Sequence, residues 1–395
     1  MFSISAACWP VLGPASTLAD LGAEVIKVEK PGVGDDTRRW GPPFLSADKP
    51  GAEQGESAYF LSANRGKKSI TIDFTKPEGQ ALVKRLAAGS DIMLENFKLG
   101  GLARLGLDYE SLRTLNPRLI YCSITGFGQT GPYRHRAGYD FLMQGMSGLM
   151  SVTGEPAGEP MKVGVAVTDL FTGMYATTAV LAALAERERS GLGQHIDIAL
   201  FDVQVATMAN QIMSYLVSGE QPPRLGNAHP SIVPYQVFPT ADGHVIIAVG
   251  NDDQFARLVM TLGVPEFAAD PRFATNPARV ANRAVLIADL ATLIGEQTSR
   301  HWIAALEAVG VPCGPINGFA DLDTDEQVLE RRIFTQIAHP HGEIRGVASP
   351  IRFSRTEVDD TRPPPLLGED TNEILAEVLG LREAEIASLR QAKIV

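Results

Sequence analysis

The sequence predicts an α/β protein with a large domain built on a mostly parallel, helix-covered sheet, together with a smaller α+β domain. Between residues 24 and 125, short apolar strands alternate with helical segments, the order typical of a parallel sheet. After a Pro- and Gly-rich linker at 218–230, two strands flank Ala241-Asp-Gly243, which is a hairpin signal. The length of 395 residues also exceeds that of one ordinary domain.

Apolar periodicity, together with Gly and Pro, delimits the elements of the large domain. A Thr75-Lys-Pro-Glu78 capping box starts a helix that ends near Ala88. We expect strands at residues 24–29, 69–74, 91–95, 119–125 and 195–200. We expect helical segments at 18–21, 75–88, 102–105, 109–115, 170–190 and 201–217.

The smaller domain should contain a hairpin, three helices and one further strand. Its expected strands are 235–238, 244–249 and 311–316, and its expected helices are 253–262, 283–294 and 300–309. Asp370 with Glu373 predicts a cap for the last helix, which carries Ile374, Leu375 and Val378. The predicted limits are 1–200 for the large domain, 201–230 for a helix and linker, 231–325 for the small domain and 326–395 for the return linker and C-terminal helices packing on the large domain.

Composition excludes several classes of function. The net charge of −11, without a compensating basic run, argues against a nucleic-acid-binding protein. Cys8, Cys122 and Cys313 are far apart and predict reduced thiols, and the histidines make no zinc spacing, so we expect no metal. No apolar run approaches the ~20 residues of a membrane span, and no basic segment marks a signal peptide. We therefore expect a soluble cytoplasmic protein.

Thr168 and Asp169 stand where an alternating Val163, Val165, Val167 pattern changes into a long apolar helix. Free backbone N–H groups and the helix dipole should keep a carboxylate there ionised and fixed. Asp169 is therefore either a helix N-cap or a carboxylate nucleophile.

Gly126-Phe-Gly128-Gln-Thr-Gly131 matches a dinucleotide-binding fingerprint after a strand. Pro132, Tyr133 and the charged residues 134–136 do not resemble a helix opening, so a structural Gly-Pro loop is the preferred interpretation. The sequence contains no phosphate-binding G-x-x-x-x-G-K-[ST] motif and no G-x-S-x-G nucleophile elbow.

Basic residues occur in loops near the expected sheet edge and suit a polyphosphate, although each could be ordinary solvated surface. Asn96 and Phe97 add an amide and an aromatic face, which fits a ligand with an adenine ring. The basic residues are Arg38, Arg39, Arg65, Lys67, Lys68, Lys98 and Arg104.

Together these segments resemble the class III CoA-transferases, the CaiB/BaiF family that includes formyl-CoA transferase and carnitine-CoA transferase. The likeness covers nearly the whole chain, and within the family it is greatest to the succinate–hydroxymethylglutarate (glutarate) CoA-transferases. The matching segments are residues 18–29, 34–38, 64–69, 95–97, 126–132, 137–140, the segment around Asp169, 310–315 and 365–369, with 41–44, 121–126, 231–236 and 362–368 pointing to that subgroup.

This resemblance implies that Asp169 accepts the acyl group and that coenzyme A is a co-substrate. It implies an interlocked homodimer, in which each chain threads the other through long linkers around a Rossmann-like domain. Arg65 is a candidate for the distal carboxylate of a dicarboxylate substrate, or for a phosphate contact, and His229 lies in a segment that takes the place of the family's glycine-rich lid. The implied CoA-channel residues are Arg38, Ile72, Asp73, Phe74, Thr75, Asn96, Phe97, Lys98, Arg104, Ala137, Tyr139 and Asp140.

The segment Cys8–Pro14 is shorter than the family's usual start, which leaves the first strand and the CoA contacts near 13–17 unassigned. Three other functions stay open. An α-methylacyl-CoA racemase has the same fold but has Gly-His-Asp where this chain has Gly138-Tyr139-Asp140. A non-catalytic CoA-binding protein and a nucleotide-dependent oxidoreductase using 126–131 are the other two.

Overall fold

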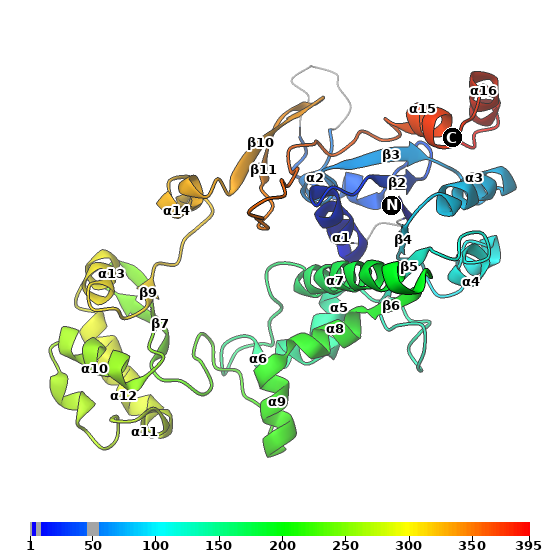
Figure 1. Cartoon of the computed structure of the whole chain (residues 1–395). Coiled ribbons are helices and arrows are strands. Elements are labelled where there is room, and N and C mark those ends of the chain that lie inside the picture. Colours follow the sequence, from blue (N-terminus) through cyan, green and yellow to red (C-terminus); the bar gives the residue numbers. More distant parts are fainter. Residues whose placement is uncertain (1, 5–8, 46–54) are drawn as a thin grey trace. The chain divides into compact units, whose positions relative to one another are not determined.

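A computed structural model describes residues 2–4, 9–45 and 55–395 of the chain (Figure 1). The chain divides into two compact units and passes back and forth between them. The larger unit comprises residues 1–149, 163–213 and 329–395, and the smaller unit comprises 150–162 and 214–328. The domain limits expected from the sequence stay a prediction. Cys8 lies outside the described residues.

The larger unit is built on a sheet whose neighbouring strands are all parallel, which confirms the predicted α/β class. Its six strands in the described residues have the order β3-β2-β1-β4-β5-β6, so the strand order reverses beside β1. Ligands of such sheets bind beyond the carboxyl ends of the strands at this reversal. The strands are β1 Phe2–Ile4, β2 Val25–Glu29, β3 Lys67–Thr71, β4 Ile92–Glu95, β5 Ile120–Thr125 and β6 His195–Ala199.

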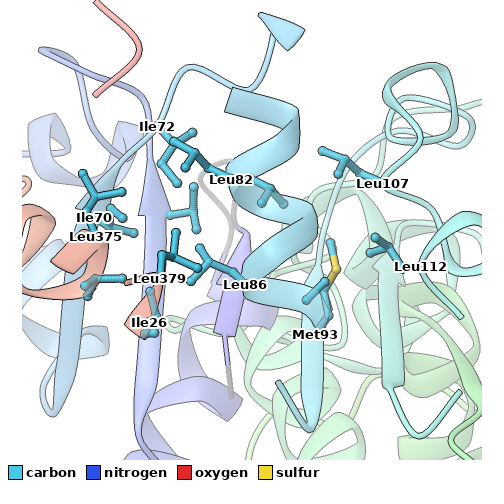
Figure 2. Close-up of a cluster of buried hydrophobic side chains, with 14 of the residues drawn as sticks. Ile26, Ile70, Ile72, Leu82, Leu86, Met93, Leu107, Leu112, Leu375 and Leu379 are labelled. Carbon is cyan, nitrogen blue, oxygen red and sulfur yellow. The ribbon is translucent and has the colours of Figure 1, made fainter. Parts of the chain in front are cut away.

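One face of this sheet packs on α3 (Pro77–Ala88), α4 (Tyr109–Leu112) and the C-terminal segment. Leu82 and Leu86 recur one turn apart on α3 and are buried against strand side chains (Figure 2). Ile374 and Leu375 join the same core from the far end of the sequence. The C-terminal elements are α15 Thr371–Glu373, the π-helical η5 Ile374–Val378 and α16 Glu383–Gln391.

The opposite face packs on α1 (Trp9–Asp20), α7 (Val167–Ser190) and α8 (Leu200–Thr207). At Gly173 of α7 an added Cβ would come within 3.0 Å of the Pro14 ring, so the two helices approach closely there. By length and composition α7 meets the requirements for crossing a membrane, contrary to our expectation from the sequence. Its packing against α1, α8 and β5 is that of a core helix.

The smaller unit has its own core, in which Phe238, Phe255 and Trp302 are buried. Its sheet is antiparallel, with the order β7-β8-β9. Its elements are β7 Tyr235–Thr240, β8 Gly243–Ala248, β9 Cys313–Gly314, η3 Pro265–Ala268, η4 Asp321–Asp323, α10 Asp252–Thr261, α11 Asn276–Ala281, α12 Arg283–Ile294, α13 Ser299–Glu307 and α14 Glu326–Glu330.

Residues 163–166, with the alternating Val163 and Val165, precede α7 without forming a strand. Two local expectations were wrong. The helix expected at 201–217 is broken between α8 and α9 (Ala209–Ser218), where Ala209 has a positive φ of 44°. Helix α3 has Lys76 as its N-cap without a side-chain cap, because Thr75 donates to Asp73 instead.

The C-terminal region differs most from the sequence prediction. Asp370 accepts the Ser69 amide at 2.7 Å instead of capping a helix, and so joins the C-terminal segment to β3. An unexpected hairpin, β10 (Phe334–His339) with β11 (Gly342–Val347), forms in the return segment. His339 at its turn is buried. The remaining elements are η1 Asp36–Arg39, η2 Ala103–Leu105, α2 Ala58–Ala63, α5 Asp140–Met146 and α6 Leu149–Val152.

Truncating Leu375 tests whether the C-terminal segment is part of the sheet's core. Leu375→Ala should lower the free energy of unfolding by about 2–5 kcal/mol, because it opens a cavity in a fully buried position. Val378→Ala is the matched control, since Val378 lies in the same η5 segment but is 51% exposed. Urea unfolding of both variants measures the difference, and equal losses would contradict this packing.

Candidate active site

A cleft of about 440 Å³ lies where the loops that follow β4 and β5 meet. Its lining comes from segments at the carboxyl ends of these strands, where ligands of a parallel sheet bind. The lining residues are Asp36, Asn96, Phe97, Lys98, Leu99, Gly101, Thr125, Gly126, Arg134, His135, Arg136, Ala137, Gly138 and Tyr139.

Backbone packing and two side chains hold these loops together. A Cβ added at Gly126 would lie 2.7 Å from the Gly138 Cα, so the chain can cross itself here only with glycine at this point. Asn96 Nδ2 donates to the Ile124 carbonyl at 2.5 Å, and the Phe97 amide donates to Glu95 at 2.7 Å. Burial raises the pKa of Glu95 to about 7.

The fingerprint-like segment 126–131 forms a loop, as the sequence analysis preferred. Gly128 and Gly131 both have φ of +80°, and the next helix, α5, begins only at Asp140. A dinucleotide fingerprint requires a helix that opens directly after the glycines. The segment therefore lacks the context of a dinucleotide site.

The structure brings five of the expected CoA-channel residues to this cleft. They are Asn96, Phe97, Lys98, Ala137 and Tyr139. Phe74 lies beside them, since its ring centroid is 5.9 Å from that of Phe97 in an edge-on contact. The CoA contacts of all these residues stay predictions.

The other expected CoA residues lie elsewhere. Ile72 is 1% exposed in the hydrophobic core. Thr75 Oγ1 donates to Asp73 at 2.5 Å in the turn after β3, and this bond lowers the pKa of Asp73. Arg104 lies exposed in η2. These residues do not line the cleft, and their CoA contacts also stay predictions.

Arg38 and Arg65 are engaged in ion pairs. Arg38 is buried, donates to Glu29 at 2.7 Å and to Glu56 at 2.7 Å, and lies 3.8 Å from the Phe60 ring centroid. Arg65 donates through two nitrogens to Asp20, at 2.8 and 2.6 Å. Either guanidinium would have to exchange a carboxylate for a ligand, so both predicted contacts stay predictions.

His229 lies in the smaller unit, so the structure does not relate it to the cleft. Its Nδ1 accepts the Ser231 amide at 3.1 Å, and its ring is 5.3 Å from that of Tyr235. These contacts order the turn at the end of the linker. Its role toward a substrate stays a prediction.

Sequence reasoning did not select residues 134–136 as binding residues, yet Arg134, His135 and Arg136 all line the cleft. Arg136 stacks 4.6 Å from the Tyr133 ring centroid, which leaves its guanidinium edge beside the cleft. The signal was present in the sequence, since three basic residues, 134–136, follow the Gly131-Pro132-Tyr133 segment. With Lys98 they make this cleft cationic in an acidic protein.

Asp169 lies in the first turn of α7 with 6% of its surface exposed. Its Oδ1 is buried and has no hydrogen-bond partner among the described residues. Burial, and secondarily the charge of Asp140, raises the pKa of Asp169 to about 8. The expectation that backbone amides keep this carboxylate ionised was wrong, because burial disfavours its charged form and Asp140 accepts the Thr168 and Asp169 amides.

Asp140 connects this carboxylate to the cleft. Its Oδ1 accepts the Thr168 amide at 2.8 Å and the Asp169 amide at 3.4 Å. The preceding residue, Tyr139, lines the cleft. Asp169 Oδ1 accepts no hydrogen bond from the described residues. Once this carboxyl group loses its proton, that oxygen is suited to act as a nucleophile toward an acyl ligand.

The described residues offer no cluster of metal ligands. Within residues 2–4, 9–45 and 55–395, no three His, Cys, Asp or Glu side chains are grouped so that they could hold a metal ion. The thiols of Cys122 and Cys313 are free, and burial raises the pKa of each.

Comparison with known proteins identifies the family. A family model described as CoA-transferase family III matches residues 5–371. The chain is 55% identical to a succinate–glutarate CoA-transferase of Agrobacterium fabrum, over 91% of this chain and 90% of that protein. It is 45% identical to a succinyl-CoA:glutarate CoA-transferase of Mus musculus, over 95% of this chain and 85% of that protein. A CAIB/BAIF family protein from Brucella suis has the same fold, with a TM-score of 0.83 and 51% identity over 96% of this chain and 98% of that one.

Replacing Asp169 tests whether burial raises the pKa of its carboxyl group. Because the folded pKa is raised from 3.8 to about 8, the folded protein holds this proton more tightly than the unfolded chain. The resulting stabilisation is present below about pH 4 and is lost as the pH rises toward 8. Between these limits Asp169→Asn should therefore gain stability relative to the parent protein as the pH rises, by at most about 1.4 kcal/mol per pH unit.

Urea unfolding at a series of pH values measures this difference. Glu188→Gln is the control, because Glu188 lies on the same helix with its side chain 72% exposed, and it should show no comparable trend. Parallel pH profiles for Asp169→Asn and the parent protein would contradict the raised pKa.

Proposed function

The chain belongs to CoA-transferase family III, and from this premise we propose that it transfers CoA from succinyl-CoA to a free dicarboxylic acid such as glutarate or hydroxymethylglutarate. It is an enzyme of the CoA-transferase class. The geometry that carries the proposal is the buried Oδ1 of Asp169, which has no partner among the described residues, at the N-terminus of α7. The choice of succinyl-CoA and glutarate rests on the names of these two relatives, and hydroxymethylglutarate follows from the family resemblance.

The first half of the reaction charges the enzyme. An Asp169 carboxylate oxygen attacks the thioester carbonyl of succinyl-CoA, the C–S bond breaks, and CoA leaves as a thiolate. The product is a mixed anhydride between Asp169 and succinate. The thiolate then attacks the Asp169 carbonyl carbon, so that succinate leaves and an aspartyl-CoA thioester remains.

The second half reverses these steps with the acceptor. The acceptor carboxylate attacks the aspartyl thioester, which gives a new anhydride and releases the CoA thiolate. The thiolate attacks the acyl carbon of the acceptor, and Asp169 leaves as a carboxylate. One thioester replaces another, so the reaction needs no ATP to drive it.

The cationic cleft is the proposed site of the CoA phosphates. Lys98, Arg134 and Arg136 supply charge, and guanidinium groups suit phosphate oxygens. Phe97 offers an aromatic face to the adenine ring. Arg65 remains the proposed partner of the distal carboxylate, with Asp20 as the group that it would release.

Transfer from succinyl-CoA to glutarate tests the proposed function. The parent protein should form glutaryl-CoA, which chromatography measures. The rate of transfer by Asp169→Ala should be at least about 10³-fold lower, because no nucleophile remains. With succinyl-CoA alone, hydroxylamine should form a hydroxamate at residue 169 of the parent protein, identified by mass spectrometry.

Asp202→Ala is the control, since Asp202 is an exposed carboxylate on α8 in the same unit, and it should keep the activity. Full turnover by Asp169→Ala would reject the covalent route. Exchange of an α-proton without CoA transfer would favour the racemase alternative.

A homodimer completes the proposal. Tyr139 and helices α5 and α7 carry large apolar side chains that are 41–63% exposed, which is unusual for a surface that stays in water. A second copy of the chain, interlocked through the linkers, would cover them. These residues are Tyr139, Phe141, Leu142, Leu170, Phe171, Met174, Tyr175 and Leu181. We also place the enzyme in the cytoplasm.

A charge in this apolar surface tests the homodimer. Light scattering of the eluted parent protein should give twice the mass of one chain. Leu181→Glu should shift the protein toward monomer, because burying the new glutamate charge in the interface costs free energy. Glu188→Gln, an exposed change on the same helix, should leave the dimer intact. A parent protein that is monomeric at micromolar concentration would overturn the proposal.

A further inference from the structure

The N-terminus of α7 has no capping side chain at its own N-cap position. Its N-cap is Ala166, which has no side chain that could accept a hydrogen bond. The Val167 amide donates to the Val165 carbonyl, and the Leu170 amide to the Ala166 carbonyl. The two amides between them, those of Thr168 and Asp169, donate to Oδ1 of Asp140 on another helix.

Asp140 is itself held in one orientation. Its Oδ2 accepts Gln144 Nε2 at 2.7 Å, and Gln144 is fully buried. Gln144 Oε1 in turn accepts the Val163 amide at 2.8 Å, which ties the start of α5 to the segment leading into α7. Both oxygens of Asp140 are thus occupied by donors from fixed positions.

This arrangement matters for Asp169 because of its place in the helix. Asp169 is the third residue of α7, a position from which a carboxylate often reaches back to amides at a helix N-terminus. A carboxylate oxygen that accepts amide hydrogens is a weaker nucleophile. With Asp140 on those amides, Asp169 Oδ1 stays without a partner among the described residues.

We propose that Asp140 is a positioning residue for CoA transfer: by accepting the Thr168 and Asp169 amides, its carboxylate keeps the Asp169 oxygen free to attack the thioester. This role rests on the proposed function of Asp169. It differs from the CoA contact expected for Asp140 from the family resemblance, because it acts through Asp169 and not through the coenzyme.

The same carboxylate should influence the pH dependence of the reaction. Asp140 is the charged group that raises the pKa of Asp169 in addition to burial. Other titratable groups on the elements packed against α7 are Asp20 on α1, Tyr121 and Cys122 on β5, His195 and Asp197 on β6, Asp202 on α8, and Tyr139 directly before α5. None of these is among the causes of the raised pKa of Asp169.

Two substitutions of Asp140 separate the effect of the hydrogen bonds that it accepts from the effect of its negative charge. Asp140→Asn retains an oxygen that can accept the amides but has no charge, so it should keep at least about a tenth of kcat. The acid limb of its kcat/KM profile should move to lower pH by about one pH unit. Asp140→Ala leaves the amides to Asp169 and should lower kcat at least about 100-fold, with the dissociation constant for free CoA unchanged.

Calorimetry with CoA, circular dichroism and steady-state kinetics with succinyl-CoA and glutarate measure these outcomes. Asp202→Asn is the control for a charge on a neighbouring helix, and it should leave the acid limb in place. The proposal is overturned if Asp140→Ala keeps kcat, if the acid limb of Asp140→Asn does not move, or if either variant loses CoA affinity in place of kcat. Failure of the proposed function would instead appear as absence of transfer by the parent protein.

If Asp140→Ala does not fold, Gln144→Leu provides the second test. It removes the donor that orients Asp140 Oδ2 but leaves the Asp140 charge, so kcat should fall about tenfold with the acid limb in place. An unchanged kcat in this variant would contradict the positioning role.

Discussion

The site depends on the pairing of one carboxylate with the N-terminus of α7. A helix N-terminus attracts negative charge because its first amides lack partners within the helix. Here two carboxylates, Asp140 and Asp169, are close to the same terminus, and Asp140 holds the amides. Asp169 is thereby buried without a partner among the described residues, which is costly for a polar group and is typical of a reacting one.

A second constraint is the way in which this acidic chain uses its cations. Arg38 is buried between Glu29 and Glu56, Lys27 pairs with Asp35 at 2.5 Å, and Lys68 contacts Glu24 and Glu373. The Arg38–Glu29 and Lys27–Asp35 pairs are buried and hold the loop after β2 to the sheet, because removing one partner would leave an uncompensated buried charge. The Lys68 pairs are partly exposed and contribute less. The cleft takes its positive charge from a different source, Lys98 and residues 134–136.

The parallel sheet brings these separate features to one edge. The order reverses beside β1, and the loops after β4 and β5 leave the sheet in neighbouring positions. The glycine crossing at 126 and 138 then returns the chain to the start of α5, where Tyr139 lines the cleft and Asp140 contacts α7. The cationic cleft and the N-terminus of α7 are therefore linked through two consecutive residues.

The sequence by itself determined the class of fold, most strand positions, the start of a long helix near Asp169 and the family, because apolar periodicity and ordered motifs are local properties of the chain. It could not determine which acid each cation or amide meets. Asp140 lies 28 residues before Thr168, and Arg65 and Asp20 are 45 residues apart. The β10–β11 hairpin, the cationic 134–136 turn at the cleft and the raised pKa of Asp169 were likewise decided only by the tertiary structure, since burial and charge pairing depend on which distant segments pack together.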